Sequence, residues 1–99
     1  MNTILIELVK GLELRLEFLA DGVINFHIAR NEVLRGAQVL KYSQKVFDAI
    51  FDSGVKLILI SLSKKAEARH IRLMALRCGF KKHCEIDNNI IYFLIKGSE

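Results

Sequence analysis

A helical pattern that stops at a glycine and leads directly into a strand pair constrains the fold of this chain more than any other feature. Residues 63–78 read as a helix, with Ser63 as the expected N-cap. Gly79 is expected to end this helix, and Phe80 to pack back against it. Two strands are predicted within residues 82–95, joined by Asp and Asn residues that tolerate turn dihedrals. The sequence therefore predicts a helix followed by a C-terminal hairpin.

Three more strands are predicted near the N-terminus, over residues 3–9, 12–18 and 23–29. In the second strand, apolar residues alternate strictly with charged ones, so one face is expected to be buried and the other solvated. An Asp-Gly pair separates the second strand from the third, which is a hairpin signal. These strands are expected to form an antiparallel meander.

A helix and a strand are predicted between these two regions. Residues 37–52 have an apolar stripe with helical spacing, and Gly54 follows as the expected cap. Residues 55–62 are mostly Leu and Ile, so this strand is expected to be buried on both faces. The order β-β-β-α-β-α-β-β requires at least one parallel crossover. The predicted class is α+β, with a mixed sheet in a single domain over residues 1–99.

Composition narrows the class of protein. The 99 residues are 52 % hydrophobic, which is typical of a folded domain. The apolar runs are too short to cross a bilayer, and no signal peptide is recognised, so no membrane partner is expected. Cys78 and Cys84 lack a disulfide framework, so reduced thiols and a cytoplasmic location are expected. With His70 and His83 they match no zinc-finger spacing, so no metal site is predicted.

Positive charge is concentrated in the second half of the chain. Residues 64–82 contain seven basic residues and one acid, whereas the whole chain has a net charge of +4. A negatively charged partner is therefore expected here: an acidic protein surface first, and nucleic acid second, since no aromatic platform accompanies the charge. The predicted partner-binding residues are Lys65, Arg69, Arg72, Arg77, Lys81 and Lys82.

The helix, the Gly79-Phe80 pair and the hairpin resemble the last third of the Gcn5-related N-acetyltransferase (GNAT) superfamily. The predicted element order is that of the superfamily without its first strand and first two helices, so the resemblance covers nearly the whole chain. It implies a truncated GNAT-like fold. It also implies acetyl-CoA as a candidate cofactor, and acetyl transfer to a protein or small amine as a candidate activity.

In that superfamily, a loop with the pattern Arg or Gln, two residues, Gly, one residue, Gly or Ala holds the pyrophosphate at a helix N-terminus. The corresponding cofactor-binding positions in this chain are Arg35, Gly36, Ala37, Gln38 and Val39. Neither register of the motif is intact. Starting at Arg35 puts Gln38 and Leu40 at the two small positions. Taking Gly36 as the first glycine leaves Val33 and Gln38 at the other two.

The resemblance also identifies positions for catalytic residues. Many active members have an Asn near the start of the last helix, and a Tyr four residues before the Gly-Phe pair that serves as general acid. Ala68 and Ala75 stand at these positions. His27 is the candidate general base, and Glu13 and Glu17 are similar candidates. A half-exposed strand face without a catalytic role is the alternative for all three.

Residues 70–73, Gly79 and the ending at residues 93–97 resemble acetyltransferase-like phage proteins, some of them active and others with eroded cofactor motifs. The leading prediction is a phage or prophage protein of the host cytoplasm or virion. It would have degenerate motifs and bind a macromolecular partner in virion assembly or host-protein inhibition. An active acetyl-CoA-dependent N-acetyltransferase and a basic nucleic-acid-binding module are the alternatives. A homodimer through residues 4–9 or 90–95 is also predicted, because a truncated sheet leaves an edge or a face uncovered.

Overall fold

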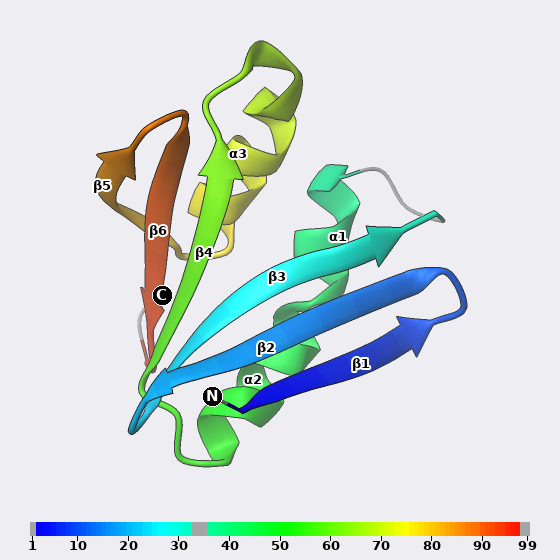
Figure 1. Ribbon diagram of the computed structural model, residues 1–99, viewed down its shortest axis with the longest axis vertical. Helices are drawn as coiled ribbons and strands as arrows, with labels where there is room; N and C mark the ends of the chain where they lie inside the picture. Colours follow the sequence, from blue (N-terminus) through cyan, green and yellow to red (C-terminus); the bar gives the residue numbers. More distant parts are fainter. Residues whose placement is uncertain (1, 33–35, 98–99) are drawn as a thin grey trace.

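A computed structural model describes residues 2–32 and 36–97 (Figure 1). One six-stranded sheet has the order β1-β2-β3-β4-β6-β5. The strands are β1 (Thr3–Val9), β2 (Leu12–Ala20), β3 (Val23–Asn31), β4 (Leu57–Ser63), β5 (Lys81–Ile86) and β6 (Asn89–Ile95). The helices are α1 (Gly36–Tyr42), α2 (Gln44–Asp52) and α3 (Arg69–Arg77), with a 3-10 turn, η1 (Ala66–Ala68), before α3. The predicted α+β class is confirmed.

All three helices lie on one face of the sheet (Figure 1). β3 pairs parallel with β4, and β6 lies between β4 and β5, antiparallel to both, so β3, β4 and β5 run in the same direction. Crossovers between parallel strands are right-handed, and both crossovers here advance the same way across the sheet. We call the covered side the helix face and the opposite side the outer face. None of the described helices is long and apolar enough to span a membrane.

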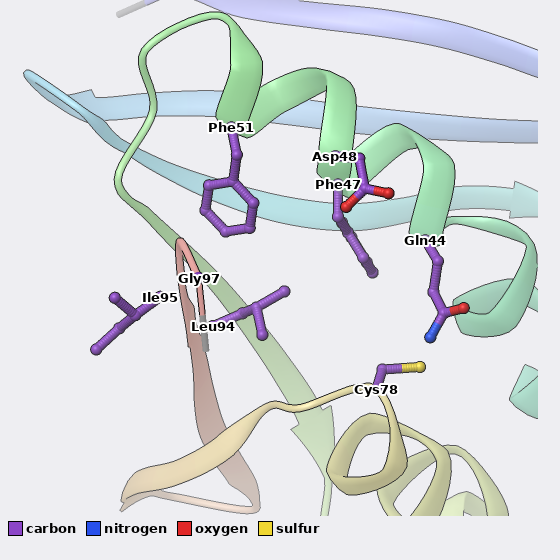
Figure 2. A pocket seen from close by; sticks show the side chains of 8 residues that line it. All are labelled: Gln44, Phe47, Asp48, Phe51, Cys78, Leu94, Ile95 and Gly97. Carbon is purple, nitrogen blue, oxygen red and sulfur yellow. The ribbon is translucent and has the colours of Figure 1, made fainter. Parts of the chain in front are cut away.

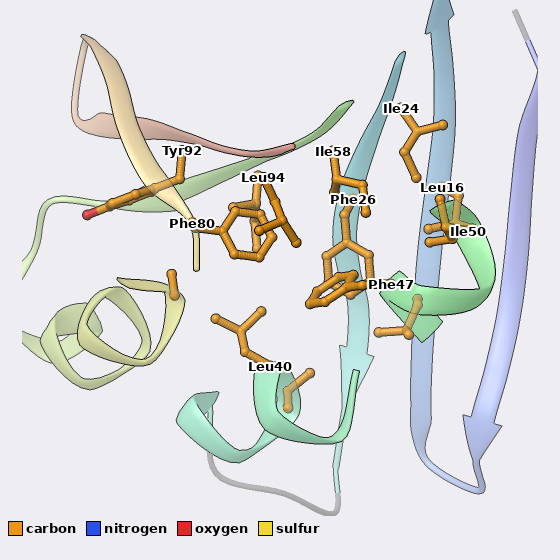
Figure 3. Packing of buried hydrophobic residues seen from close by; sticks show 14 of the residues in the cluster. Leu16, Ile24, Phe26, Leu40, Phe47, Ile50, Ile58, Phe80, Tyr92 and Leu94 are labelled. Atoms are coloured by element: carbon orange, nitrogen blue, oxygen red, sulfur yellow. The ribbon is translucent and has the colours of Figure 1, made fainter. Parts of the chain in front are cut away.

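The core lies between the helix face and the helices (Figure 3). Phe26 of β3, Phe47 of α2 and Phe80 form a row of edge-to-face contacts, with ring centroids 5.0 and 5.4 Å apart. Phe80 is only 2 % exposed and belongs to the same buried cluster as Ala75 of α3, so the prediction that it packs back after Gly79 is confirmed. These aromatic contacts connect the sheet with α2 and with the end of α3.

The helix predicted over residues 37–52 is interrupted at Ser43. The Ser43 hydroxyl donates a hydrogen bond of 2.7 Å to the carbonyl of Val39, and the Ser43 side chain is fully buried. A serine hydroxyl that bonds back to the preceding turn competes with the helical backbone and often bends a helix. The Ser43 amide also donates to the Val39 carbonyl, at 2.9 Å, and the segment forms two short helices, α1 and α2, on either side of Ser43.

One boundary prediction and one burial prediction are wrong. Residues 63–78 do not form one helix, because β4 continues to Ser63 and α3 begins only at Arg69 after the 3-10 turn. The strand predicted over residues 55–62 is not buried on both faces: Ile58 and Ile60 are buried, whereas Ser61 is exposed. The reason is that the described helices cover only one face of the sheet.

Candidate functional site

The parallel strands β3 and β4 separate part-way along their length. They pair only from Val23 with Leu57 to Phe26 with Ile60. Beyond this point β3 stays paired with β2, and β4 stays paired with β6, so the two halves of the sheet diverge as a V (Figure 1). The backbone groups that would continue the β3–β4 ladder therefore face the gap, where another extended chain could bind them.

A cavity of about 180 Å³ lies at the point where the two strands separate. It is lined by three consecutive residues of each strand: Phe26, His27, Ile28, Ile60, Ser61 and Leu62. The strand alternation turns Phe26 and Ile60 towards the helix face and the core. The site thus combines an apolar floor with exposed backbone edges, which suits a narrow ligand with apolar and amide groups.

The outer side of the cavity presents His27 from β3 and Ser61 from β4, both of them exposed. An imidazole can accept a proton near neutral pH, and a hydroxyl can donate a hydrogen bond. The structure thus places the predicted base His27 at this cavity, although its catalytic role stays a prediction. Ser61 was not predicted, because a single serine in an apolar strand has no signal until the separation of the strands is known.

The other two candidate bases lie away from the cavity. Glu13 and Glu17 are on the outer face of β2 and take part in surface ion pairs. Glu13 lies 3.4 Å from Arg30, and Glu17 accepts a hydrogen bond of 3.3 Å from the side-chain amide of Asn25. The alternative of a solvated strand face without a catalytic role therefore accounts for the positions of Glu13 and Glu17.

Two solved structures share this architecture. A protein from Desulfovibrio desulfuricans, described as an acetyltransferase of the GNAT family, aligns with a TM-score of 0.68 and 17 % identity, over 86 % of this chain and 60 % of its own. The fold is GNAT-like. A protein from Sphaerobacter thermophilus, described as an acetyltransferase, aligns with a TM-score of 0.63 and 15 % identity, over 90 % of this chain and 59 % of its own. This chain therefore spans about three fifths of each structure. No family model and no curated protein matches the sequence.

The predicted pyrophosphate loop of the GNAT-like fold leads into α1. Arg35 lies outside the described residues, and Gly36 and Ala37 form the first positions of α1. Gln38 is exposed, whereas Val39 is fully buried in the core. The side chain of Val39, one of the five predicted cofactor-binding residues, therefore serves packing. Only the Val39 backbone could contact a ligand.

Two residues at expected motif positions, Leu40 and Ala75, contribute to packing. Leu40 is fully buried and points into the core below the phenylalanine row (Figure 3). Ala75 of α3, where the sequence resemblance implies a tyrosine, is also fully buried, and α3 packs against α1. Both side chains are thus part of the packed interior, and neither can donate a proton.

The predicted partner-binding residues fall into two groups. Arg72 donates one hydrogen bond of 2.5 Å to the carbonyl of Ser63 and another of 2.7 Å to the carbonyl of Lys65. These bonds connect α3 to the end of β4. Lys82 donates a hydrogen bond to Glu85 at the β5 edge. The other four predicted residues are exposed to solvent: Lys65, Arg69, Arg77 and Lys81.

Glu85 is held between two lysines. Its carboxylate lies 2.5 Å from the Lys64 ammonium and also pairs with Lys82. The hydrogen bond from Lys64, followed by the one from Lys82, lowers the pKa of Glu85 to about 2, and the bond to Glu85 raises the pKa of Lys82. All three side chains are well exposed, so solvent screens much of this attraction. The cluster joins the start of the β4–α3 connection to β5.

A second cavity, of about 260 Å³, lies between α2, the end of α3 and the end of β6 (Figure 2). Cys78 and Gln44 face each other across it. Burial raises the pKa of the Cys78 thiol above its ordinary value, and the hydrogen bond with Gln44 offsets part of this rise. A neutral thiol at a helix C-terminus is a poor nucleophile.

Proposed function

We propose that this protein binds an acyl-CoA, with the pantetheine arm in the gap between β3 and β4, and that it transfers the acyl group poorly. The observation that supports this most directly is the early end of the β3–β4 pairing, after Phe26 and Ile60, next to a cavity of about 180 Å³. Pantetheine is an extended chain with two amides. Such a chain can add to a strand edge through backbone hydrogen bonds while its apolar parts contact the cavity floor.

Weak transfer is proposed because two supports of the usual chemistry are absent from the described residues. Ala75 stands where a proton donor for the departing thiolate is implied, and general acid catalysis typically contributes about 10²–10⁴ in rate. Gln38 and Leu40 stand where small residues would let the backbone approach a pyrophosphate. The pantetheine arm is therefore expected to contribute more of the affinity than the nucleotide.

The test is isothermal titration with acetyl-CoA, S-acetylpantetheine and adenosine 3′,5′-bisphosphate. Acetyl-CoA and S-acetylpantetheine are expected to bind with affinities within about tenfold of each other, a difference of 1.4 kcal/mol, and the nucleotide weakly or not at all. A ligand that binds only the folded state also raises the free energy of unfolding, by about 2.7 kcal/mol at a hundredfold excess over its dissociation constant. Absence of acetyl-CoA binding at millimolar concentration would overturn the proposal.

A matched pair of variants locates the site. Ser61→Trp fills the outer mouth of the cavity, whereas Ala20→Trp adds the same side chain at an exposed position at the end of β2. Ser61→Trp is expected to weaken acetyl-CoA binding at least tenfold, and Ala20→Trp to leave it unchanged. Equal affinities for both variants would show that the ligand binds elsewhere.

A second candidate function is the binding of an acidic protein surface, favoured by the four exposed cations Lys65, Arg69, Arg77 and Lys81. An acidic peptide is expected to bind with an affinity that falls as salt rises, and single-stranded DNA to bind more weakly because no aromatic platform accompanies these cations. A fourfold Ala variant that binds the acidic peptide unchanged would overturn this candidate. The nucleic-acid module, partner binding in virion assembly or host-protein inhibition, and the phage origin stay predictions from the sequence.

A further inference from the structure

The two edges of the sheet differ in how they are protected. β5 carries Lys81 and Lys82, and its register shifts between Lys82 and Cys84. Lysines and register irregularities are the usual means by which proteins prevent an edge strand from pairing with another chain. β1 has no Lys and no Pro, and its only charge is Glu7. Its register shift comes after Glu7, so the run from Thr3 to Glu7 is regular.

The hydrogen bonding of β1 shows which backbone groups face outward. The amide of Phe18 donates to the carbonyl of Asn2 at 2.9 Å, so these two residues form a hydrogen-bonded pair. Such pairs alternate along an antiparallel ladder, so the backbone groups of Ile4 and Ile6 also point towards β2. The N–H and C=O groups of Thr3, Leu5 and Glu7 therefore point towards the free edge.

Apolar side chains are also uncovered along this edge. Leu5 is 62 % exposed on the outer face, and Ile4 is 47 % exposed on the helix face. Beneath β1, a groove of about 230 Å³ runs between the sheet and α2, with Ile4, Ile6 and Ile50 among its lining. Among the described residues, the edge thus combines unpaired backbone groups with exposed apolar surface.

We propose that β1 pairs with β1 of a second copy, antiparallel and centred on Leu5. In this register Leu5 lies opposite the partner's Leu5, and Thr3 lies opposite the partner's Glu7. Thr3, Leu5 and Glu7, which turn their backbone groups outward, then each have a partner. On the helix face, Ile4 lies opposite the partner's Ile6, so apolar side chains meet at the open rim of the groove.

Charge favours a second copy in this register over the alternatives. Glu7 is the only charged residue of β1, and it lies 3.8 Å from Arg30 of its own chain, which also pairs with Glu13 and Glu32. The basic residues of β5 lie at the opposite edge of the sheet. A register centred on Glu7 would place two carboxylates opposite each other, which is destabilising. In the Leu5 register, the Thr3 hydroxyl can instead donate a hydrogen bond to the partner's Glu7.

The test is the mass of the full chain in solution, measured by sedimentation equilibrium over a concentration series. One strand pair buries less than the roughly 800 Å² per partner that is typical of stable complexes, so micromolar to submillimolar association is expected. Leu5→Lys places two ammonium groups opposite each other and is expected to give a monomer. Leu19→Lys is the control, because Leu19 is also exposed, at 47 %, but lies on β2. It is expected to leave the dimer intact.

Three outcomes would overturn the proposal: a wild-type monomer at millimolar concentration, a Leu5→Lys variant as dimeric as the wild type, or equal loss of dimer in both variants. Circular dichroism checks that the variants are folded. Hydrogen exchange of the wild type gives a second measurement. The amides of Thr3, Leu5 and Glu7 are expected to gain protection as concentration rises, whereas concentration-independent exchange would contradict the pairing.

Discussion

The backbone amide of Phe80 donates a hydrogen bond of 3.0 Å to the carbonyl of Ala75, across the end of α3. The amide of Gly79 donates a second bond, of 3.1 Å, to the carbonyl of Leu76. These two bonds form a Schellman motif, in which the residue after the helix adopts a left-handed conformation. Gly79 has φ = +97°, as the motif requires. One glycine thus ends α3 and directs Phe80 into the core.

Gly79→Ala is expected to destabilise the protein by at least about 1 kcal/mol, because a side chain at positive φ is strained. The measurement is the free energy of unfolding in urea. Leu73→Ala is the control, since Leu73 is 43 % exposed on the same helix and its truncation is expected to cost little. Equal effects of the two changes would contradict the assigned role of Gly79.

Ala75→Tyr is expected to lower stability by about 1–3 kcal/mol or more, because a large side chain is forced into the packed contact between α3 and α1. Leu76→Tyr introduces the same side chain one position along, where Leu76 is 50 % exposed, and is expected to be nearly neutral. Thermal melting of both variants checks this difference. If Ala75→Tyr melts like the wild type, the position has room for a tyrosine, and packing does not require the small side chain of Ala75.

Glu85 is expected to make the stability of the protein fall in acid. Its pKa is lowered from 4.5 to about 2 in the folded state, so its contribution is present above pH 4.5 and is lost as pH falls towards 2. The urea midpoint of the wild type should therefore fall more steeply over this range than that of Glu85→Gln. Because the cluster is exposed, 1 M salt should reduce the difference, since the screening length is then about 3 Å. Parallel pH profiles at low salt would contradict this account.

The strand and helix content could be predicted because it depends on local patterns. The strict alternation over residues 12–18 fixes which side chains of β2 face the core, and Leu14 and Leu16 are buried as that pattern requires. The break at Ser43 could not be predicted, because a serine in a helix can point to solvent or bond back to the preceding turn. The start of α3 at Arg69 depends on how Arg72 binds the carbonyls of the preceding connection.

The candidate site was only partly predictable, because it arises where two strands part. The alternation within β3 and within β4 is the same whether or not the two strands stay paired, so the end of pairing at Phe26 and Ile60 has no sequence signal. His27 could be proposed as a base from its residue type alone. Ser61 could not, since its position beside His27 follows only from the register of the sheet.

Acetyl transfer to amines is expected to be slow. With Ala75 in place of a proton donor, the rate should fall about 10²–10⁴ below that of an enzyme with a general acid, since that is the usual contribution of such a group. Chromatographic measurement of CoA release, with acetyl-CoA and a panel of amines and peptides, is expected to give rates close to the hydrolysis background. Under this expectation, His27→Gln leaves CoA release unchanged. Sustained multiple turnover would contradict the expectation and favour an active N-acetyltransferase. In that case, loss of turnover in His27→Gln would identify His27 as the base.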